Sequence, residues 1–309
     1  MKKKNLCGLG LLCVALAASA CTIGDVEERA EVSMTTSTDV DPRPTLSGQT
    51  MVPDADAKGD GGKSDKDPAP AAARGNVQEA LQKIVEDVQS KYGGKAGIAV
   101  AGQDEVYSAG ISEPRAAWST AKVPVAIAAE RAGSADPAMV SQAITFSDNA
   151  AAENLWQSLG GGQSAASAAS AVLAEAGLDV QVQPTVTRPG FSAFGQTQWT
   201  VADQARFIGQ LGCIAQGSGV LTAMAASDPA QSYGLGSLDN SSFKGGWGPD
   251  TNGAYEARQM GTVELNGKKV AVAIYATSPS GAYGSAQQML SALATELAGA
   301  KVQWPKAAC

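Results

Sequence analysis

The sequence predicts an α/β chain of the α+β type, with one antiparallel five-stranded sheet flanked by terminal helices and lying beside a helical subdomain. Two observations lead to this fold class. Predicted strands lie at both ends of the folded region, with a helix-rich block between them, so the sheet must be completed by pairing between distant segments. The 309 residues are 44% hydrophobic, which is enough for a substantial core. The cleft between sheet and subdomain is the expected site.

Residues 1–20 have the pattern of an export signal. Three lysines at positions 2–4 precede the apolar stretch 6–18, and small residues follow up to Cys21. Residues 16–21 resemble a bacterial lipobox, in which the cysteine is acylated. The chain is therefore expected to be exported and anchored by a lipid on Cys21 to the outer face of the cell membrane. The alternative is an ordinary cleaved signal with a soluble product.

Residues 21–74 are predicted to form a disordered, lipid-anchored tether. They are rich in Ser, Thr, Asp, Pro, Gly and Lys and contain few large apolar residues, so they cannot bury enough surface to fold. A random coil of this length reaches on the order of 40 Å. The folded domain is expected to span residues 75–309.

The domain is expected to begin with a helix and a hairpin. Asn76 and Glu79 have the spacing of a capping pair, and apolar residues then recur at helical spacing up to Tyr92. The short apolar runs 96–101 and 105–108 are separated by a turn, which predicts two paired strands.

The remainder is a helical block followed by three strands and a helix. Residues 116–217 are rich in helix formers but include a polar, proline-containing loop at 181–198. Strands are predicted at 243–246, 257–265 and 269–277, the last two joined by the hairpin signal Asn-Gly at 266–267. A closing helix is predicted over 283–297.

The composition excludes several classes of function. The formal net charge is −7, and no basic cluster lies beyond the N-terminus, which argues against nucleic acid as a partner. Histidine is absent, which removes the Ser-His-Asp triad, the Cys-His pair and the common catalytic zinc sites. Any general base must be Lys, Asp, Glu or Tyr, and neither a metal nor a cofactor is expected. A monomer is expected.

The cysteines predict one disulfide. Cys7 and Cys13 leave with the signal and Cys21 carries the lipid, so Cys213 and Cys309 remain as a pair in an oxidising compartment. This bridge would hold the C-terminal tail to the domain. The alternative is two unpaired thiols.

The first chemical motif is Ser119 and Lys122. Their spacing places both side chains on one face at the start of a helix. A serine hydroxyl needs a neighbour to take its proton, and a partly buried lysine in its neutral form can do so. Backbone N–H groups at the helix start could stabilise an oxyanion. The alternative is a serine that only caps the helix.

Two further motifs follow. Ser147-Asp148-Asn149 lies between two predicted helices, where the serine could relay a proton and the asparagine could orient the lysine and a substrate. Residues 243–247 read Phe-Lys-Gly-Gly-Trp on a strand, where glycines allow a ligand to approach and Lys244 supplies positive charge for a carboxylate. The alternatives are a helix cap and a solvent-exposed lysine beside a glycine kink.

Together and in this order, the three motifs resemble the SxxK, SDN and KTG set of class A β-lactamases and penicillin-binding proteins. The segments around residues 143–152 and 199–207 are also similar to that family. The resemblance implies a β-lactamase-like fold over about residues 76–298. It implies the following roles: Ser119 acylated, Lys122 assisting, Ser147 relaying the proton, Asn149 and Gly246 contributing to substrate binding, Lys244 holding the substrate carboxylate, and the N–H groups of Ser119 and Trp247 forming the oxyanion hole.

The sequence also departs from the family. Class A enzymes use a glutamate in a loop after the second motif to activate the deacylating water, but residues 182–198 contain no Asp or Glu. Gly245 replaces a hydroxyl residue that would bind the carboxylate, and Trp247 is expected to narrow the cleft. The interval from Ser119 to Ser147 is short, so a compact helical hairpin turning near 133–137 is expected to return the chain to the site.

Three functional hypotheses follow. The first is a serine hydrolase or acyltransferase that is acylated at Ser119 by a β-lactam or a peptidoglycan-like peptide and deacylates slowly or not at all. The second is a catalytically weak or inactive lipoprotein that keeps the fold as a binding module of the cell envelope. The third is a D,D-peptidase type of acyltransferase, which needs no loop glutamate. Covalent adducts on Ser119 distinguish the first from the second, and release of D-Ala from a peptide identifies the third.

Overall fold

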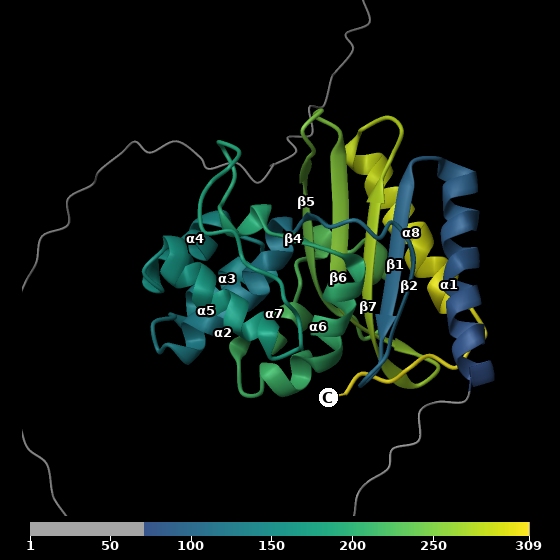
Figure 1. Cartoon of the computed structure of the whole chain (residues 1–309), viewed down its shortest axis with the longest axis horizontal. Coiled ribbons are helices and arrows are strands. Elements are labelled where there is room, and N and C mark those ends of the chain that lie inside the picture. Colours follow the sequence, from purple (N-terminus) through teal and green to yellow (C-terminus); the bar gives the residue numbers. More distant parts are fainter. Residues whose placement is uncertain (1–70, 309) are drawn as a thin grey trace, which may run out of the picture. The chain divides into compact units, whose positions relative to one another are not determined.

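The structure is a computed structural model that describes residues 71–308, with side chains from residue 76 onward. The predicted export signal, the lipidated Cys21, nearly all of the tether and Cys309 lie outside the described residues. Within the described part, a helix and two strands precede a helical block, which is followed by three strands and a helix (Figure 1). This order is the one that the sequence predicts.

The main sheet has five antiparallel strands in the order β2-β1-β7-β6-β5 (Figure 1). The first two strands along the chain therefore pair with the last ones through β1 and β7, which confirms the predicted non-local pairing. The strands span the following residues: β1 Lys95–Ala101, β2 Val106–Gly110, β5 Ser242–Pro249, β6 Tyr255–Leu265 and β7 Lys268–Thr277.

The two faces of the sheet carry side chains of different size. On β7, Val272 and Ile274 face one side with the terminal helices, whereas Ala271 and Ala273 face the helical subdomain. Successive side chains of a strand point to opposite faces, so this alternation separates the two cores. The small residues let helix α6 (Val201–Ile214) lie close to the sheet, and a Cβ added at Gly209 would lie 3.2 Å from that of Ala101.

Helices α1 (Ala71–Tyr92) and α8 (Tyr283–Gly299) cover one face of the sheet (Figure 1). Both are amphipathic, with apolar residues at helical spacing buried against the strands. The start predicted for the first helix is wrong, because α1 already includes the residues before Asn76. Alanines at 71–73 have the highest helix propensity, so the helix does not need to begin at the Asn76 cap.

The predicted hairpin between the last two strands is confirmed. Asn266 and Gly267 have φ of 52° and 71° between β6 and β7. Two consecutive residues with positive φ define a type I′ turn, whose twist matches that of the flanking strands.

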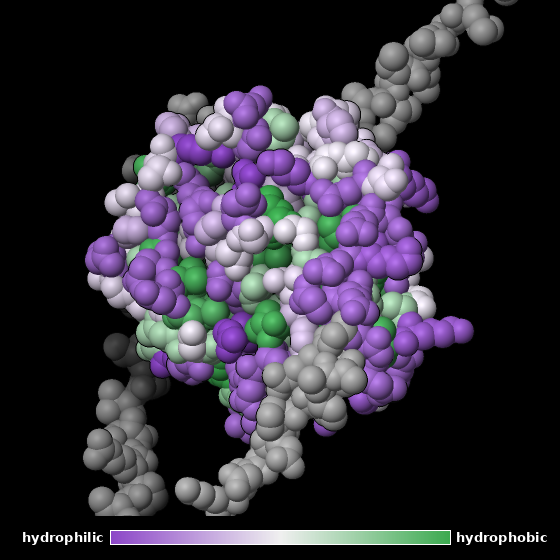
Figure 2. Space-filling view, turned by 45° about the vertical axis from the view of Figure 1, so that its right-hand side comes forward, coloured by the Kyte–Doolittle hydropathy of each residue, from purple (hydrophilic) through white to green (hydrophobic). Residues whose placement is uncertain are grey.

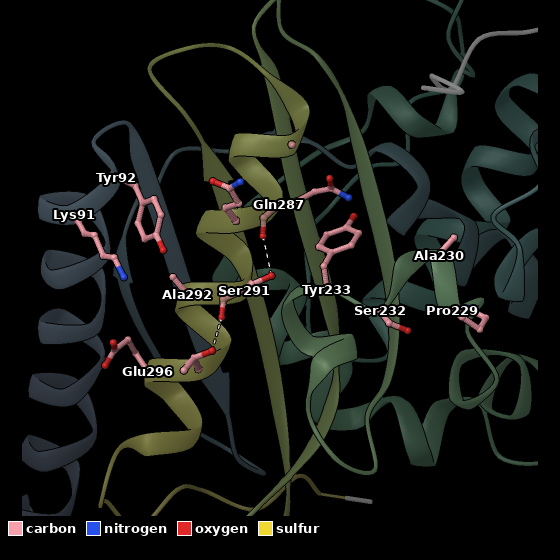
Figure 3. Close-up of a pocket in the computed structure, with 13 residues that line it drawn as sticks. Lys91, Tyr92, Pro229, Ala230, Ser232, Tyr233, Gln287, Ser291, Ala292 and Glu296 are labelled. Atoms are coloured by element: carbon pink, nitrogen blue, oxygen red, sulfur yellow. Dashed lines mark hydrogen bonds between the residues drawn. The ribbon is translucent and has the colours of Figure 1, made fainter. Parts of the chain in front are cut away.

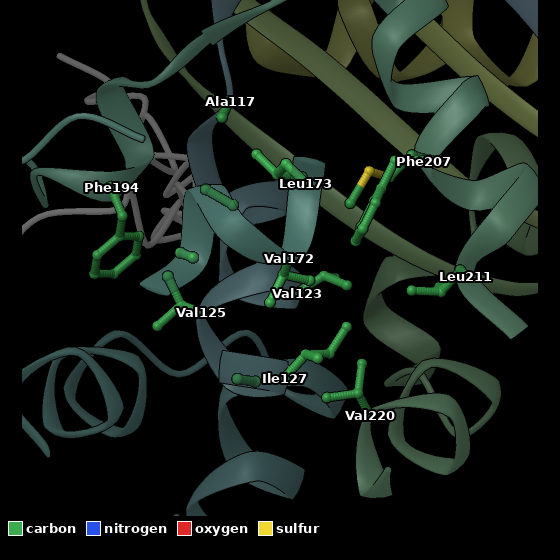
Figure 4. Close-up of a cluster of buried hydrophobic side chains, with 14 of the residues drawn as sticks. Ala117, Val123, Val125, Ile127, Val172, Leu173, Phe194, Phe207, Leu211 and Val220 are labelled. Atoms are coloured by element: carbon green, nitrogen blue, oxygen red, sulfur yellow. The ribbon is translucent and has the colours of Figure 1, made fainter. Parts of the chain in front are cut away.

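The helical subdomain packs around a second apolar core (Figure 4). Its main contributors come from several helices, as the labelled Val123, Ile127, Leu173 and Phe207 show, and Ala117 adds a residue from the segment before Ser119. The helices are α2 Lys122–Arg131, α3 Pro137–Thr145, α4 Asn149–Ser158, α5 Gly162–Ala174, α6 and α7 Gly219–Ala225. The 3-10 helices η1 Trp118–Ala121 and η2 Phe194–Gln196 contribute Ala121 and Phe194 to the same core. Two further ones, η3 Pro229–Gln231 and η4 Gly234–Ser237, precede β5, and Leu235 of η4 packs in the core under α1 and α8.

A second, two-stranded sheet was not predicted. It pairs β3 (Arg115–Ala116) with β4 (Gln198–Trp199) in antiparallel register. Two residues are too few to produce a periodic pattern in the sequence. The pairing ties the segment before Ser119 to the end of the polar loop.

The C-terminal tail runs back along the domain to α6. The backbone N–H of Ala307 donates to the carbonyl of Lys269 (3.0 Å), and that of Ala308 donates to Gly209 on α6 (2.9 Å). Cys213 also lies on α6. This path is compatible with the predicted Cys213–Cys309 disulfide, which stays a prediction because Cys309 is not described.

Hydrophilic residues cover most of the face shown in Figure 2, and hydrophobic ones appear as small separate patches. Among the described residues, the large hydrophobic side chains with the most exposure are Phe146 and Val186. In residues 71–308, the search for a helix with the length and hydropathy of a membrane span finds none.

We predict that Leu290→Ala, in the buried face of α8, lowers the free energy of unfolding by about 2–5 kcal/mol, because it leaves a cavity in the core. Urea denaturation followed by circular dichroism measures this. The control is Gln288→Ala on the exposed face of the same helix, which is expected to change stability by less than about 0.5 kcal/mol. Equal effects of the two substitutions would contradict the assignment of the buried face.

Candidate active site

Ser119 and Lys122 lie at the start of the central helix of the subdomain. Ser119 is the second residue of η1, and Lys122 begins α2 directly after it. Their side chains are 4% and 2% exposed. Ala117 occupies the cap position of η1 and makes no side-chain capping bond, so Ser119 is not a helix cap.

The residue before Ser119 has an unusual backbone conformation. Trp118 has φ of 51°, in the left-handed region that non-glycine residues rarely adopt. Such a conformation costs of order 1–3 kcal/mol and persists only when the surroundings determine it. The indole Nε1 of Trp118 donates to Oε1 of Glu256 at 2.9 Å, and its ring packs edge-on against Phe191 with centroids 5.3 Å apart.

The second motif forms the turn between α3 and α4. Asp148 is the N-cap of α4, where its side chain accepts from the N–H of Ala151 at 2.7 Å. Ser147 precedes it with φ of 57°, and Asn149 is the first helical residue. The cap is therefore Asp148, which leaves the side chains of Ser147 and Asn149 for other contacts. The hairpin of α2 and α3 turns at residues 132–136 and returns the chain to Lys122, as predicted.

Lys122 is held by the second motif. Its Nζ donates to Oδ1 of Asn149 at 2.8 Å, to the carbonyl of Asp148 at 3.2 Å and to Oγ of Ser147 at 3.4 Å. A further hydrogen bond goes to the backbone carbonyl of Ser147. All four of these acceptors are uncharged oxygens.

Lys244 reaches the same serine from the sheet. Its Nζ donates to Oγ of Ser147 at 2.8 Å and to the carbonyl of Gly245 at 3.0 Å. The side chain is 1% exposed, so the alternative of a solvent-exposed lysine is wrong. The Ser147 hydroxyl thus lies between the amines of Lys122 and Lys244, and the structure brings together all three motifs that the sequence analysis identified.

Gly246 lies directly against the turn that contains Ser119. A Cβ at this position would lie 2.9 Å from the backbone N of Ser119 and from the carbonyl O of Ala117, and 3.0 Å from N of Thr120. These distances are shorter than real Cβ contacts, so only glycine fits. The β5 strand and the Ser119 turn therefore approach each other more closely than a side chain would allow.

The expectation that Trp247 narrows the cleft is wrong. Lys244 and Gly246 face the Ser119 side, so Trp247 points to the opposite face of the sheet by strand alternation. Its ring packs with Tyr283 and Tyr255, with centroids 4.6 and 6.2 Å away, against the core under α1 and α8. Only the backbone of Trp247 remains a candidate for contact with a ligand beside Ser119.

Gly245 has room for a side chain. A Cβ there would meet the side chains of Gln231, Gln259 and Tyr233, each at 3.7 Å, which is ordinary van der Waals contact. The packing therefore does not require glycine at position 245, although the third motif lacks its usual hydroxyl residue there.

The polar loop is closed by a buried amide, which sequence reasoning missed. The side chain of Gln196 is 7% exposed. Its Oε1 accepts from the N–H of Arg188 at 2.7 Å and from that of Thr187 at 3.2 Å. Its Nε2 donates to three backbone carbonyls of the loop. Arg188 then donates to the carbonyls of Pro249 (2.9 Å) and Asp250 (3.1 Å) at the end of β5. The loop is thereby fastened to the sheet.

Sequence reasoning also missed a group of buried polar residues behind the turn that contains Ser119. Arg258 on β6 is 1% exposed and donates to the carbonyl of Ala116 at 2.7 Å, while Glu256 accepts from Trp118 and from the hydroxyl of Tyr275 (2.6 Å). Burial lowers the pKa of Arg258 to about 10, an effect that the nearby Glu256 opposes, and burial together with Glu256 raises the pKa of Tyr275. The available signal was Arg258 inside the predicted strand 257–265, with Glu256 directly before that strand.

A groove on the surface of α8 is separate from the Ser119 site. It has a volume of about 720 Å³ and runs across α8, between the end of α1 and the segment around Tyr233 (Figure 3). Tyr92, Tyr233 and Gln287 line it, and none of the three motifs contributes a residue. The groove lies on the face of the sheet that α1 and α8 cover.

The sheet, the helical subdomain and the convergent motifs define a β-lactamase-like fold. Solved structures of class A β-lactamases are similar to it over nearly their whole length. The TLA-1 extended-spectrum β-lactamase has a TM-score of 0.60 and 14% identity, and the match covers 73% of this chain and 99% of that one.

Two other structures give the same result. The TLA-3 extended-spectrum β-lactamase has a TM-score of 0.59 and 14% identity, with 72% of this chain and 98% of that chain covered. A β-lactamase from Burkholderia vietnamiensis has a TM-score of 0.57 and 17% identity, with coverages of 71% and 96%. No protein-family model and no curated protein matches the sequence. The likeness is therefore one of fold.

We predict that Gly246→Ala lowers the free energy of unfolding by about 1–3 kcal/mol, because the new methyl group overlaps the backbone of the Ser119 turn. The matched control is Gly245→Ala, where the methyl group has ordinary contacts. It is expected to leave stability unchanged or to raise it by up to about 1 kcal/mol through the unfolded state. Urea denaturation of the two variants tests this, and similar losses for both would contradict the close approach at Gly246.

Proposed function

We propose that this protein is a serine acyl-enzyme of the β-lactamase and penicillin-binding type, acylated at Ser119 by a β-lactam or a peptidoglycan-like peptide. The observation that carries the proposal is the position of the Ser147 hydroxyl, 3.4 Å from Nζ of Lys122 and 2.8 Å from Nζ of Lys244, beside the turn that holds Ser119. The β-lactamase-like fold supports it.

Acylation by a β-lactam would proceed through three linked proton transfers. The Ser119 hydroxyl attacks the lactam carbonyl carbon as its proton passes to the neutral amine of Lys122, and the lactam C–N bond then breaks. The leaving nitrogen takes a proton from the Ser147 hydroxyl, and Lys122 returns its proton to Ser147. Ser119 ends as an ester, and the ligand gains one proton on nitrogen.

The remaining groups would bind and polarise the ligand. Lys244 offers its charge to a ligand carboxylate at the edge strand, and Asn149 positions both Lys122 and an acyl side chain. The N–H of Ser119, which lies against Gly246, and that of Trp247 on β5 are the proposed oxyanion donors. Donors fixed in the backbone stabilise the developing charge without reorganisation.

Turnover is expected to be slow. Residues 182–198 contain no carboxylate, and the amide of Gln196 is engaged in hydrogen bonds to the backbone of the loop itself. General-base assistance to the attacking water is worth typically 10²- to 10⁴-fold, so its loss favours an acyl-enzyme that persists. The second hypothesis, a binding lipoprotein without catalysis, predicts no acyl-enzyme at all.

The proposal includes export and anchoring at the outer face of the cell membrane through Cys21. It rests on the sequence of residues 1–21 alone.

We predict a covalent adduct of one ligand mass after the protein is mixed with benzylpenicillin, as measured by intact-protein mass spectrometry. Ser119→Ala is expected to abolish the adduct, because it removes the nucleophile. After free ligand is removed, the adduct is expected to persist because no loop carboxylate activates water. An unmodified wild-type protein, or an adduct that survives Ser119→Ala, would reject the proposed function.

A further inference from the structure

Strand β6 carries two charged side chains inside the core, directly behind the nucleophile turn. Glu256 is 4% and Arg258 is 1% exposed. They are two residues apart, so they point to the same face of the sheet, and they pair with Gly248 and Gly246 of β5. Neither residue belongs to the three motifs.

Arg258 holds the segment that leads to the nucleophile. Its Nη1 donates to the carbonyl of Arg115 at 2.9 Å and to that of Ala116 at 2.7 Å, and its Nε donates to Oε1 of Gln204 at 2.9 Å. The Nε2 of Gln204 in turn donates to Oγ1 of Thr120 at 3.0 Å. This chain of hydrogen bonds therefore contacts the backbone before Ser119 and the side chain after it.

Glu256 holds the residue next to Ser119. Its Oε1 accepts from Nε1 of Trp118 at 2.9 Å, and its Oε2 accepts from the hydroxyl of Tyr275 at 2.6 Å. Gly248 has no side chain, and a Cβ there would overlap the Trp118 ring. The indole is thus fixed on one side by a hydrogen bond and on the other by the strand.

The strained backbone of Trp118 shows why such support is needed. A bulky residue with φ of 51° keeps this conformation only when its surroundings determine it. In that conformation the indole reaches Glu256 and the next residue, Ser119, begins the turn against Gly246. Loss of the hydrogen bond removes the polar contact that fixes the indole.

Glu256 and Arg258 are costly to bury. A buried charge needs hydrogen bonds to replace its water, so the presence of two charged residues is weak evidence for a stabilising role. Besides Glu256, the titratable groups that act on Arg258 are Asp203, Arg115 and Tyr275. Glu256 contacts Trp118, the residue next to Ser119, and Arg258 contacts the carbonyl of Ala116 three residues before Ser119, which points to a role in placing Ser119.

We infer that Glu256 is a positioning residue for acylation, which holds the strained Trp118 and so places Ser119. The inference rests on the proposed function. Glu256 is not itself a catalytic residue, because it acts through Trp118.

Three substitutions test this hydrogen bond. Trp118→Phe removes the indole N–H, Glu256→Leu removes both acceptor oxygens, and Glu256→Gln keeps an amide oxygen that can accept from the indole. For each variant, the acylation rate at saturating penicillin and the apparent Kd of the non-covalent complex are measured on the folded fraction. The double variant of Trp118→Phe and Glu256→Leu completes the thermodynamic cycle.

The saturating rate is expected to fall roughly 10- to 100-fold in Trp118→Phe and in Glu256→Leu, because a misplacement of about 1 Å can cost 10²-fold. The apparent Kd is expected to change less than about 3-fold, and Glu256→Gln is expected to retain most of the rate. The double variant is expected to be acylated no more slowly than Glu256→Leu, because both substitutions break the same hydrogen bond between Trp118 and Glu256.

Glu130→Gln is the matched control. The carboxylate of Glu130 also accepts two hydrogen bonds, from Oγ of Ser218 and from the N–H of Gly219, but it lies in the last turn of α2, away from Ser119. This variant is expected to lose stability and keep the wild-type saturating rate.

Wild-type rates in Trp118→Phe and Glu256→Leu, additive losses in the double variant, or equal losses in Glu256→Gln and Glu256→Leu would overturn the inference. If Glu256→Leu does not fold, a slow saturating acylation rate in Trp118→Phe together with a nearly wild-type rate in Glu256→Gln supports the inference. A wild-type rate in Trp118→Phe together with a slow rate in Glu256→Gln overturns it. A wild-type protein that is not acylated rejects the proposed function instead. Crystal structures of the two Glu256 variants then test the positioning role. Residue 118 is expected to leave the left-handed region of backbone conformation in Glu256→Leu but not in Glu256→Gln. An unchanged backbone at residue 118 in Glu256→Leu overturns the inference.

Discussion

The hydroxyl of Ser147 is the point on which the site depends, because it receives the buried amines of both Lys122 and Lys244. These residues come from a helix start, a turn between helices and an edge strand. One shared oxygen therefore connects the helical subdomain to the sheet beside the turn that contains Ser119. Burying two amines requires that hydrogen bonds replace their water, and Asn149 with nearby backbone carbonyls supplies them.

The sheet serves the site by bringing the backbone of β5 against the Ser119 turn. Glycine at position 246 permits this approach, and strand alternation puts Lys244 on the same face while it sends the Trp247 ring to the opposite core. Behind the turn, Glu256 and Arg258 satisfy polar groups that would otherwise be buried without partners. The result is a rigid scaffold around a small number of polar side chains.

Predictions from the sequence failed where the deciding contacts join segments far apart in the chain, or where an element has only two residues. Alternation along β5 by itself puts the Trp247 side chain on the face opposite Lys244, whereas the family resemblance predicted that it lies in the cleft. The two-stranded β3–β4 pair is too short for periodicity to reveal. Gln196 is one glutamine among many in the sequence, and only the folded loop shows that its amide is enclosed by the backbone. Glu256 and Arg258 left a weak signal, since charged residues in or next to a predicted core strand need partners that the sequence does not name.

The sequence by itself determined the order of helices and strands, the turn at Asn266–Gly267, the three motifs and the lack of a carboxylate in residues 182–198. These features are local, because they follow from residue type, spacing and backbone preference. Only the tertiary structure decided that β1 pairs with β7, that Ser147 lies between two lysines, and which side chains support Trp118. Those contacts join segments far apart in the chain, and they exist only once the packing of both cores has fixed the distances between them.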